Sequence, residues 1–276
     1  MKKKKMNFTT VLLVIIFLAG LSLLLYPTVA NSWNKYQASK QGDVYIEKVA
    51  SLTDEEYKRM WEEAVNYNQI LANNSNRFNL SEDELRNYME TLNVDDIGMI
   101  GVIKIPSIDT TIPIYHGTSE SVLQKYSGHM EGTSLPIGGL GTHSVISGHR
   151  GLPSAKLFSD IVKLEEGDYF MINVLEETLT YQVDRIAIIE PTDYSKFNIE
   201  PEQDYVTLMT CTPYGVNTHR LLVRGHRVDN LPDDFLDTRN EGSIIDKRIV
   251  AIFVAIPILL ILFIWLMLKD RKRKTA

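Results

Sequence analysis

The stretch YVTLMTCTPYGVNTHRLLVRGHRV, residues 205–228, predicts two β-strands joined by a turn. An apolar, β-branched run ends at Cys211, a turn-rich TPYG segment follows, and a second such run begins at Arg220. Runs of this kind, bounded by Pro and Gly, are typical of β-strands. Because only eight residues separate Cys211 from Arg220, we expect the two strands to pair as antiparallel neighbours.

This pairing gives the chain's only cysteine a cationic partner. Strand alternation puts Cys211 on the same face as Met209, so its sulfur can face an open groove where the turn begins. The guanidinium of Arg220 would then lie near the sulfur, where its planar donors can hold a developing oxyanion. Spacing alone leaves Arg224 and Arg227 as alternatives, and it leaves open that all three arginines are solvated strand residues.

A cysteine nucleophile also needs a proton partner. His149 follows another strand-like run, in the Gly-flanked turn of SVISGHRG, and this position suits an exposed imidazole. His143 and His219 are the alternatives. His219 is closer to Cys211 in sequence, but it directly precedes Arg220 and would point to the opposite face of that strand.

The rest of the chain from residue 97 to residue 230 also reads as short strands broken by Gly and Pro, as in an all-β sandwich or barrel. The expected strands are residues 101–105, 111–115, 143–147, 169–175, 178–189, 205–210 and 220–228. A short helix is expected at residues 155–161.

Two amphipathic helices are expected before these strands. Thr53 with Glu56, and Ser81 with Glu84, fit the capping box that begins a helix, and apolar residues follow each pair at helical spacing. Residues 31–50 are polar and show no clear period, so we interpret them as a linker that leads into the first helix.

An apolar block lies near each end of the chain, at residues 8–26 and 249–268, and each is long enough to cross a bilayer core of about 30 Å. The first block is either a retained anchor or a cleaved signal. Basic residues flank both blocks on their terminal sides, which predicts that both termini are cytoplasmic and that the intervening residues are extracellular. The expected parts are a basic end with an anchor or signal at residues 1–27, a linker and helical segment at 28–94, a β-domain at 95–230, an acidic spacer at 231–248, a transmembrane helix at 249–268 and a basic tail at 269–276.

Charge and cysteine content exclude several classes of function. The chain carries 29 basic and 35 acidic residues, and many of the basic ones lie at the two ends, so the intervening part is strongly acidic. This charge argues against nucleic acid as a partner. One cysteine cannot form an internal disulfide, and no closed set of His and Cys at metal-ligand spacing is present, so we expect no metal and no cofactor.

The TLMTC motif at residues 207–211 resembles the Thr-Leu-x-Thr-Cys signature of sortases, the membrane-anchored cysteine transpeptidases of Gram-positive bacteria. Together with SVISGHRGLP, with IPIYHGT and with the CTPYGVNTHRLLVRGHRV that begins at the cysteine, it is similar to class C, the pilin-polymerising branch. The resemblance covers residues 95–230, and the apolar block near the C-terminal end also fits class C.

The resemblance implies an eight-stranded sortase-type β-barrel with short helices, preceded by a helical segment and flanked by two transmembrane helices. It makes Cys211 the nucleophile, His149 the general acid and base, and Arg220 the stabiliser of substrate or oxyanion. The implied reaction is cleavage of a Leu-Pro-x-Thr-Gly-like sorting signal at Thr-Gly through a thioester. An amine then resolves the thioester, typically a pilin lysine in pilus assembly. The alternative within the family is attachment of surface proteins to the cell-wall precursor.

The chain departs from the class C pattern ahead of the barrel. Many class C sortases carry an Asp-Pro-aromatic lid motif there, whereas this chain has no Asp-Pro before residue 95. Its nearest loop aromatic is Phe78, in Asn76-Arg77-Phe78. Either the lid is absent or this loop does a similar job with other residues.

Two other classes of protein compete with this interpretation. A papain-like hydrolase usually has its cysteine at the start of a helix and ahead of its histidine, whereas here Cys211 follows a strand and lies after His149. A membrane-tethered β-domain that binds a surface partner would leave Cys211 buried and inert. Reaction of the thiol with a sorting-signal peptide separates these readings.

Overall fold

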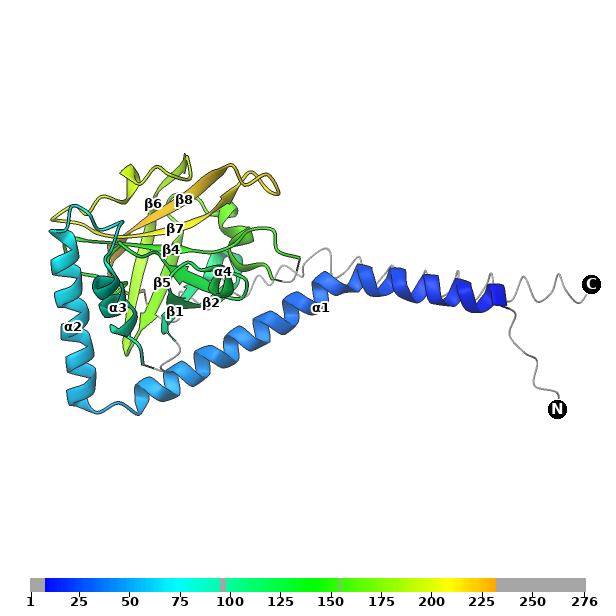
Figure 1. The fold of residues 1–276 in the computed structure, drawn as a ribbon, viewed down its shortest axis with the longest axis horizontal. Helices are drawn as coiled ribbons and strands as arrows, with labels where there is room; N and C mark the ends of the chain where they lie inside the picture. The colour runs from blue at the N-terminus through cyan, green and yellow to red at the C-terminus, as the bar shows by residue number, and fades with distance from the viewer. Residues whose placement is uncertain (1–7, 95–97, 154, 232–276) are drawn as a thin grey trace, which may run out of the picture. The chain divides into compact units, whose positions relative to one another are not determined.

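The computed structural model describes residues 8–94, 98–153 and 155–231. Within these ranges three helices are followed by a closed barrel of eight strands (Figure 1). The described residues from 31 onward form one compact unit, and residues 8–30 belong to a second unit. The expected transmembrane helix at 249–268, the basic tail and nearly all of the acidic spacer lie outside the described residues.

The barrel strands lie in the order β1-β2-β3-β4-β7-β8-β6-β5. Their bounds are β1 Met99–Ile105, β2 Thr110–His116, β3 Ser127–His129, β4 Thr142–Ser147, β5 Tyr169–Val174, β6 Glu177–Ile189, β7 Asp204–Thr212 and β8 His219–Val228. The pairs β2–β3 and β4–β7 are parallel, and the other pairs are antiparallel. All seven strands expected from the sequence are confirmed. Strand β3 was not expected, because its three residues are too few to show alternation.

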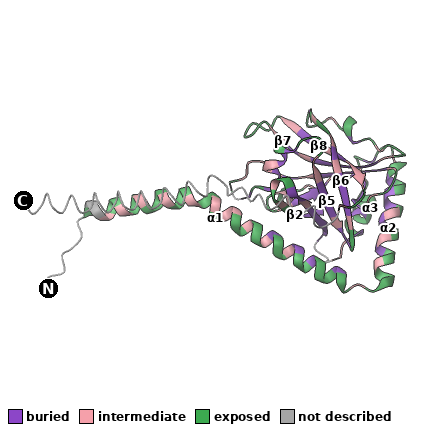
Figure 2. Ribbon diagram, turned by 180° about the vertical axis from the view of Figure 1, so that it is seen from behind, coloured by how far each residue is buried: buried purple, intermediate pink, exposed green. Residues whose placement is uncertain are grey.

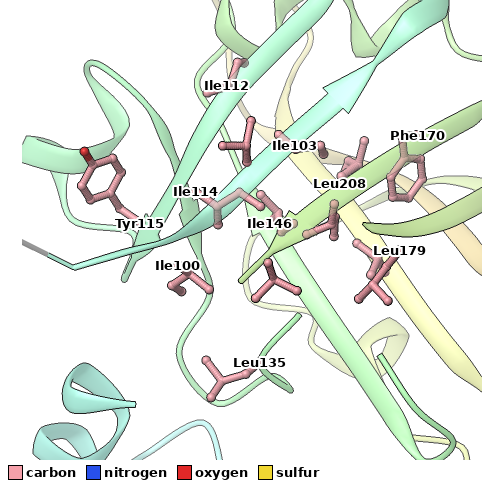
Figure 3. Close-up of a cluster of buried hydrophobic side chains, with 14 of the residues drawn as sticks. Ile100, Ile103, Ile112, Ile114, Tyr115, Leu135, Ile146, Phe170, Leu179 and Leu208 are labelled. Atoms are coloured by element: carbon pink, nitrogen blue, oxygen red, sulfur yellow. The ribbon is translucent and has the colours of Figure 1, made fainter. Parts of the chain in front are cut away.

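Alternate residues of each strand fill the barrel interior, since side chains along a strand point to opposite faces in turn. Ile103, Ile114, Ile146 and Leu208 come from four different strands and meet in this interior cluster (Figure 3). They are completely buried. The sequence pattern therefore closes the sheet by giving each strand one continuous apolar face.

A second, smaller apolar cluster lies on the opposite face of the sheet. Its buried members are Val145, Ile189, Phe197 and Leu222, and Met130 and Met209 pack against them. Phe197 belongs to η3 (Ser195–Phe197), a short 3-10 turn in the connection between β6 and β7. This connection, residues 190–203, is therefore held on the outer face of the barrel by a buried aromatic side chain.

Helix α1, Phe8–Ala50, corrects the prediction of a polar linker at residues 31–50, because the helix continues through that segment. Its residues Ala38, Tyr45 and Val49 are buried. The Tyr45 hydroxyl donates to the carbonyl of Ile100 at 2.6 Å and accepts from the amide of Leu175 at 2.9 Å. The helical period was hidden because one of its buried positions is an alanine and another, Gly42, is a glycine.

The N-terminal part of α1 is apolar, and its residues 11–30 are exposed or intermediate, as the green and pink ribbon of this helix in Figure 2 shows. It is the one helix in the described part of the chain that is long and apolar enough to cross a membrane. A retained anchor and a signal sequence both fit this finding.

Helices α2, Asp54–Ala72, and α3, Glu82–Glu90, begin as the capping boxes predict. The Thr53 hydroxyl accepts from the amide of Glu56, and the Glu56 carboxylate accepts from the amide of Thr53 at 2.9 Å. Ser81 and Glu84 repeat this arrangement. The helix expected at 155–161 is instead a 3-10 segment, η2 Leu157–Lys163, because Phe158 has a non-helical backbone that interrupts it.

Candidate active site

The predicted antiparallel pairing of the strands around Cys211 is confirmed. Strand β7 pairs with β8 so that Cys211 lies directly opposite Arg220. Val206 and Leu208 of β7 point into the barrel, whereas Met209 packs against the outer cluster. Cys211, two residues further on, is therefore on the outer face, where it is a partly buried free thiol.

The parallel pairing of β4 with β7 brings His149 beside this strand end. Ser147, the last residue of β4, is paired with Met209. The Gly148 amide then donates to the Met209 carbonyl at 3.0 Å, and the Thr210 hydroxyl donates to the Gly148 carbonyl at 2.7 Å. His149 is the next residue, so the register of two strands fixes its backbone next to the cysteine.

Phe158 packs against the turn that carries Gly148 and His149. The Phe158 amide donates to the carbonyl of His149 at 3.1 Å, and the ring is completely buried. A Cβ on Gly148 would collide with this ring, so glycine is required by the close approach of Phe158 to the backbone. The packing of Phe158 therefore explains why a glycine precedes His149.

The three predicted residues Cys211, His149 and Arg220 line one pocket of about 270 Å³. Its other lining residues are mainly apolar, and they are Thr118, Leu123, Met130, Ser147, Gly148, Ile189, Pro191, Tyr194, Phe197, Met209 and Thr210. A nucleophile, an imidazole and a fixed cation in a mainly apolar pocket can perform acyl transfer through a covalent intermediate.

Two further contacts orient the charged groups of the pocket. The imidazole Nε2 of His149 lies 3.3 Å from a carboxylate oxygen of Glu120, in α4 (Glu120–Leu123). The pKa of Glu120 is lowered from its usual value, first by the amide of Gln124 and then by His149. The guanidinium of Arg220 donates to the carbonyl of Asn217 at 3.2 Å. Sequence reasoning missed Glu120, because nothing in the local pattern connects it with a histidine 29 residues further on.

The structure places His143, an alternative proton partner, away from the pocket. Its side chain is buried, Nδ1 lies 2.9 Å from the Asn198 carbonyl, and Nε2 lies 2.8 Å from the Thr207 hydroxyl. Burial is the main cause that lowers its pKa to about 4. The other alternative, His219, lies 3.1 Å from the carboxylate of Glu190 and does not line the pocket.

The alternative arginines have structural partners of their own. Arg224 makes two hydrogen bonds to the carboxylate of Asp184, at 2.7 and 3.1 Å, and its guanidinium lies 4.0 Å from the centre of the Tyr205 ring. Arg227 donates to the carbonyl of Val228 at 2.6 Å. Neither arginine lines the pocket. Within the described ranges, no group of three or more His, Cys, Asp or Glu residues is placed to hold a metal ion.

Comparison with known proteins shows the family. The Sortase domain family matches residues 103–228. Sortase C1 of Streptococcus agalactiae is 48% identical with a TM-score of 0.68, and the match covers 70% of this chain and 100% of that chain. Sortase C of Clostridium perfringens, solved with the C-terminal cell wall sorting motif, is 41% identical with a TM-score of 0.62. This match covers 70% of this chain and 100% of that chain. Sortase D of Bacillus subtilis is 29% identical over 131 residues, covering 46% of this chain and 63% of that protein. The chain therefore belongs to the sortase family of cysteine transpeptidases.

Proposed function

We propose that this protein is a class C sortase that cleaves a Leu-Pro-x-Thr-Gly-like sorting signal at Thr-Gly and joins the acyl fragment to a pilin lysine. The observation that carries the proposal is the meeting of Cys211, His149 and Arg220 in one mainly apolar pocket. Two similar structures support the class and the substrate, since both are sortases C and one was solved with a cell wall sorting motif.

In the first step, the Cys211 thiolate attacks the carbonyl carbon of the signal's threonine. Arg220 donates hydrogen bonds to the carbonyl oxygen as it gains negative charge, because a guanidinium presents fixed donors and stays charged. The C–N bond to glycine breaks, and protonated His149 gives its proton to the leaving amine. The products are a thioester on Cys211 and a free glycine amine, and the carboxylate of Glu120 stabilises the imidazolium before its proton leaves.

In the second step, an amine attacks the thioester carbon. His149, now neutral, takes a proton from the attacking nitrogen, the C–S bond breaks and the Cys211 thiolate is restored. A pilin lysine yields an isopeptide bond in a growing pilus. The amine of a cell-wall precursor is the second candidate acceptor, and it would attach a single surface protein to the wall by the same chemistry.

We further propose that the catalytic unit lies outside the cell membrane. The apolar part of α1 would anchor it, the apolar block at residues 249–268 would form a second span, and both basic ends would be cytoplasmic. We propose for the parts at 1–27, 28–94, 95–230, 231–248, 249–268 and 269–276 the roles expected from the sequence, except that residues 31–50 of the second part are helical and not a linker.

Mass spectrometry of the protein mixed with a Leu-Pro-x-Thr-Gly peptide tests the chemistry. We expect an acyl adduct on Cys211, cleavage between threonine and glycine, and neither product in Cys211→Ala. Absence of both products in the unmodified protein would sink the proposal. Deletion of the gene tests the acceptor, because loss of high-mass pilin ladders supports a pilin lysine, whereas loss of monomeric wall anchoring supports the cell-wall precursor.

A further inference from the structure

The loop between α2 and α3 contacts two residues that line the active-site pocket, Tyr194 and Phe197. Arg77 in this loop is 9% exposed, although it carries a charge. Its guanidinium donates to the carbonyl of Gly132 at 2.7 Å and to the carbonyl of Phe197 at 2.7 Å. One side chain thus connects three segments: the helical segment, the connection after β3 and the connection between β6 and β7.

The residue that Arg77 holds is the anchor of the pocket wall. Phe197 lines the pocket together with Tyr194, and both belong to the connection between β6 and β7. The ring of Phe197 is 1% exposed and packs in the outer cluster. Arg77 therefore holds the backbone of the wall at Phe197, the residue whose side chain is buried in the outer cluster.

Phe78 extends the contact along the same wall. Its ring stacks on Tyr194 with centroids 4.8 Å apart and planes at 18°, and the guanidinium of Arg77 lies 4.3 Å from the centre of the Phe78 ring. Tyr194 in turn lies 6.2 Å from the Phe197 ring. The pocket is lined by Tyr194 and not by Phe78, so this loop contacts the wall instead of the cysteine.

Gly132 provides an independent sign of close fit. It has a φ of 79°, and a Cβ there would collide with the carbonyl of Arg77 and press on the ring of Phe78. A side chain at this position would push the loop away from the barrel. The Arg77 loop and the connection after β3 therefore fit together as closely as backbone atoms allow.

Burial of a guanidinium is costly, and desolvation lowers the pKa of Arg77 from its usual value. The cost is offset by hydrogen bonds to two carbonyls that belong to loops and not to the sheet. These bonds join segments far apart in the chain, and none of Arg77, Gly132 and Phe197 belongs to the interior cluster of the barrel. Their effect is to restrict the loops beside the pocket.

We propose that Arg77 and Phe78 form a clasp that holds Tyr194 and Phe197 in position and so sets the affinity of the pocket for apolar side chains of the sorting peptide. The proposal rests on the proposed function. Arg77 is a positioning residue, because it acts on the peptide through the wall. Since it does not line the pocket with Cys211, its loss should weaken peptide binding without slowing the acyl transfer step.

Steady-state kinetics of the full-length protein in detergent, with a fluorogenic Leu-Pro-x-Thr-Gly peptide, measure this effect. For Arg77→Ala we expect KM to rise about tenfold while kcat stays within about twofold, since a displaced wall loses binding contacts. The KM of Arg77→Lys should lie between those of the unmodified protein and Arg77→Ala. Its ammonium group can reach one carbonyl, but it lacks the planar set of donors with which a guanidinium binds two. Phe78→Leu removes the stacking and should raise KM about threefold. The matched control is Arg86→Ala, which removes an exposed arginine of α3 paired with Asp83 at 3.4 Å, and its KM should not change.

Amide hydrogen exchange of the same variants separates the clasp from the proposed function. Residues 190–203 should exchange faster in Arg77→Ala, while strands β1 and β5 should not change. An unchanged KM in Arg77→Ala would overturn the clasp. A fall in kcat as large as the rise in KM, with faster exchange throughout the barrel, would overturn it as well. If the unmodified protein cleaves no sorting peptide, the proposed function fails, and unchanged exchange at 190–203 would still refute the clasp. If Arg77→Ala does not fold, Arg77→Lys and Phe78→Leu decide by the same two measurements.

Discussion

Acid should destabilise the barrel through the buried histidine of β4. His143 is 1% exposed, and its neutral form satisfies both neighbours: Nδ1–H donates to the Asn198 carbonyl and Nε2 accepts from the Thr207 hydroxyl. Burial lowers its pKa to about 4, and the nearby charges of Arg224 and Arg77 add to this effect, against the opposing hydrogen bond to Asn198 and the charge of Asp184. Protonation would leave a buried imidazolium beside two guanidinium groups.

The sign and size of the effect follow from proton binding. An unfolded histidine has a pKa of about 6.5, so below that pH the unfolded chain binds a proton that the folded chain refuses. The contribution of neutral His143 is fully present above about pH 6.5 and is lost as the pH falls toward 4, at up to about 1.4 kcal/mol per pH unit. Between pH 7.5 and 4.5, this loss amounts to about 2.5 kcal/mol.

Other buried groups titrate in the same experiment. The test therefore compares the pH dependence of the unfolding free energy between the unmodified protein and His143→Gln. Burial is the main cause that lowers the pKa of His129 to about 3, which adds a loss of the same sign. Burial raises the pKa of Asp204, which acts in the opposite direction as the pH falls. The contributions of His129 and Asp204 cancel in the difference between the unmodified protein and His143→Gln, because both proteins contain these two residues. Glutamine suits this comparison because it keeps a donor for the Asn198 carbonyl but does not titrate.

Equilibrium urea unfolding of a fragment that spans residues 31–231, the described part of the compact unit, measures this difference. We expect His143→Gln to lose about 2.5 kcal/mol less than the unmodified protein between pH 7.5 and 4.5. Leu222→Ala is the matched control from the outer cluster, and it should cost about 2–5 kcal/mol at every pH without changing the pH slope. Equal slopes for His143→Gln and the unmodified protein would refute the reasoning.

Three further predictions concern the pocket and the helical segment. Arg220→Lys should lower kcat/KM about a hundredfold in the peptide assay, because an ammonium cannot reproduce the guanidinium fork, and near-normal rates would move this role to another residue. Glu120→Gln should lower kcat a few-fold, since it removes the charge that orients His149 and stabilises its protonated form; an unchanged kcat would make that contact incidental. Tyr45→Phe should cost about 1–3 kcal/mol of unfolding free energy by urea titration, because the carbonyl of Ile100 and the amide of Leu175 lose their shared partner. A loss below about 0.5 kcal/mol would show that water replaces it.

Features that depend on neighbours along the chain could be predicted from the sequence. Strand periodicity located seven strands, and the capping boxes at Thr53 and Ser81 located the starts of two helices. The pairing of Cys211 with Arg220 also followed from sequence, because a short connection leaves two strands few ways to pair other than side by side. In each case the contact is local, so the pattern carries the information.

Which distant groups meet depends on the folded barrel and could not be worked out from spacing along the chain. The parallel pairing of β4 with β7 places His149 beside Cys211, and that register has no signature in the spacing between them. Glu120 reaches His149, and Arg77 reaches Phe197 across 120 residues, through contacts that no local period encodes. These positions depend on how the closed barrel brings separate loops to one edge, since packing, and not sequence separation, sets such distances.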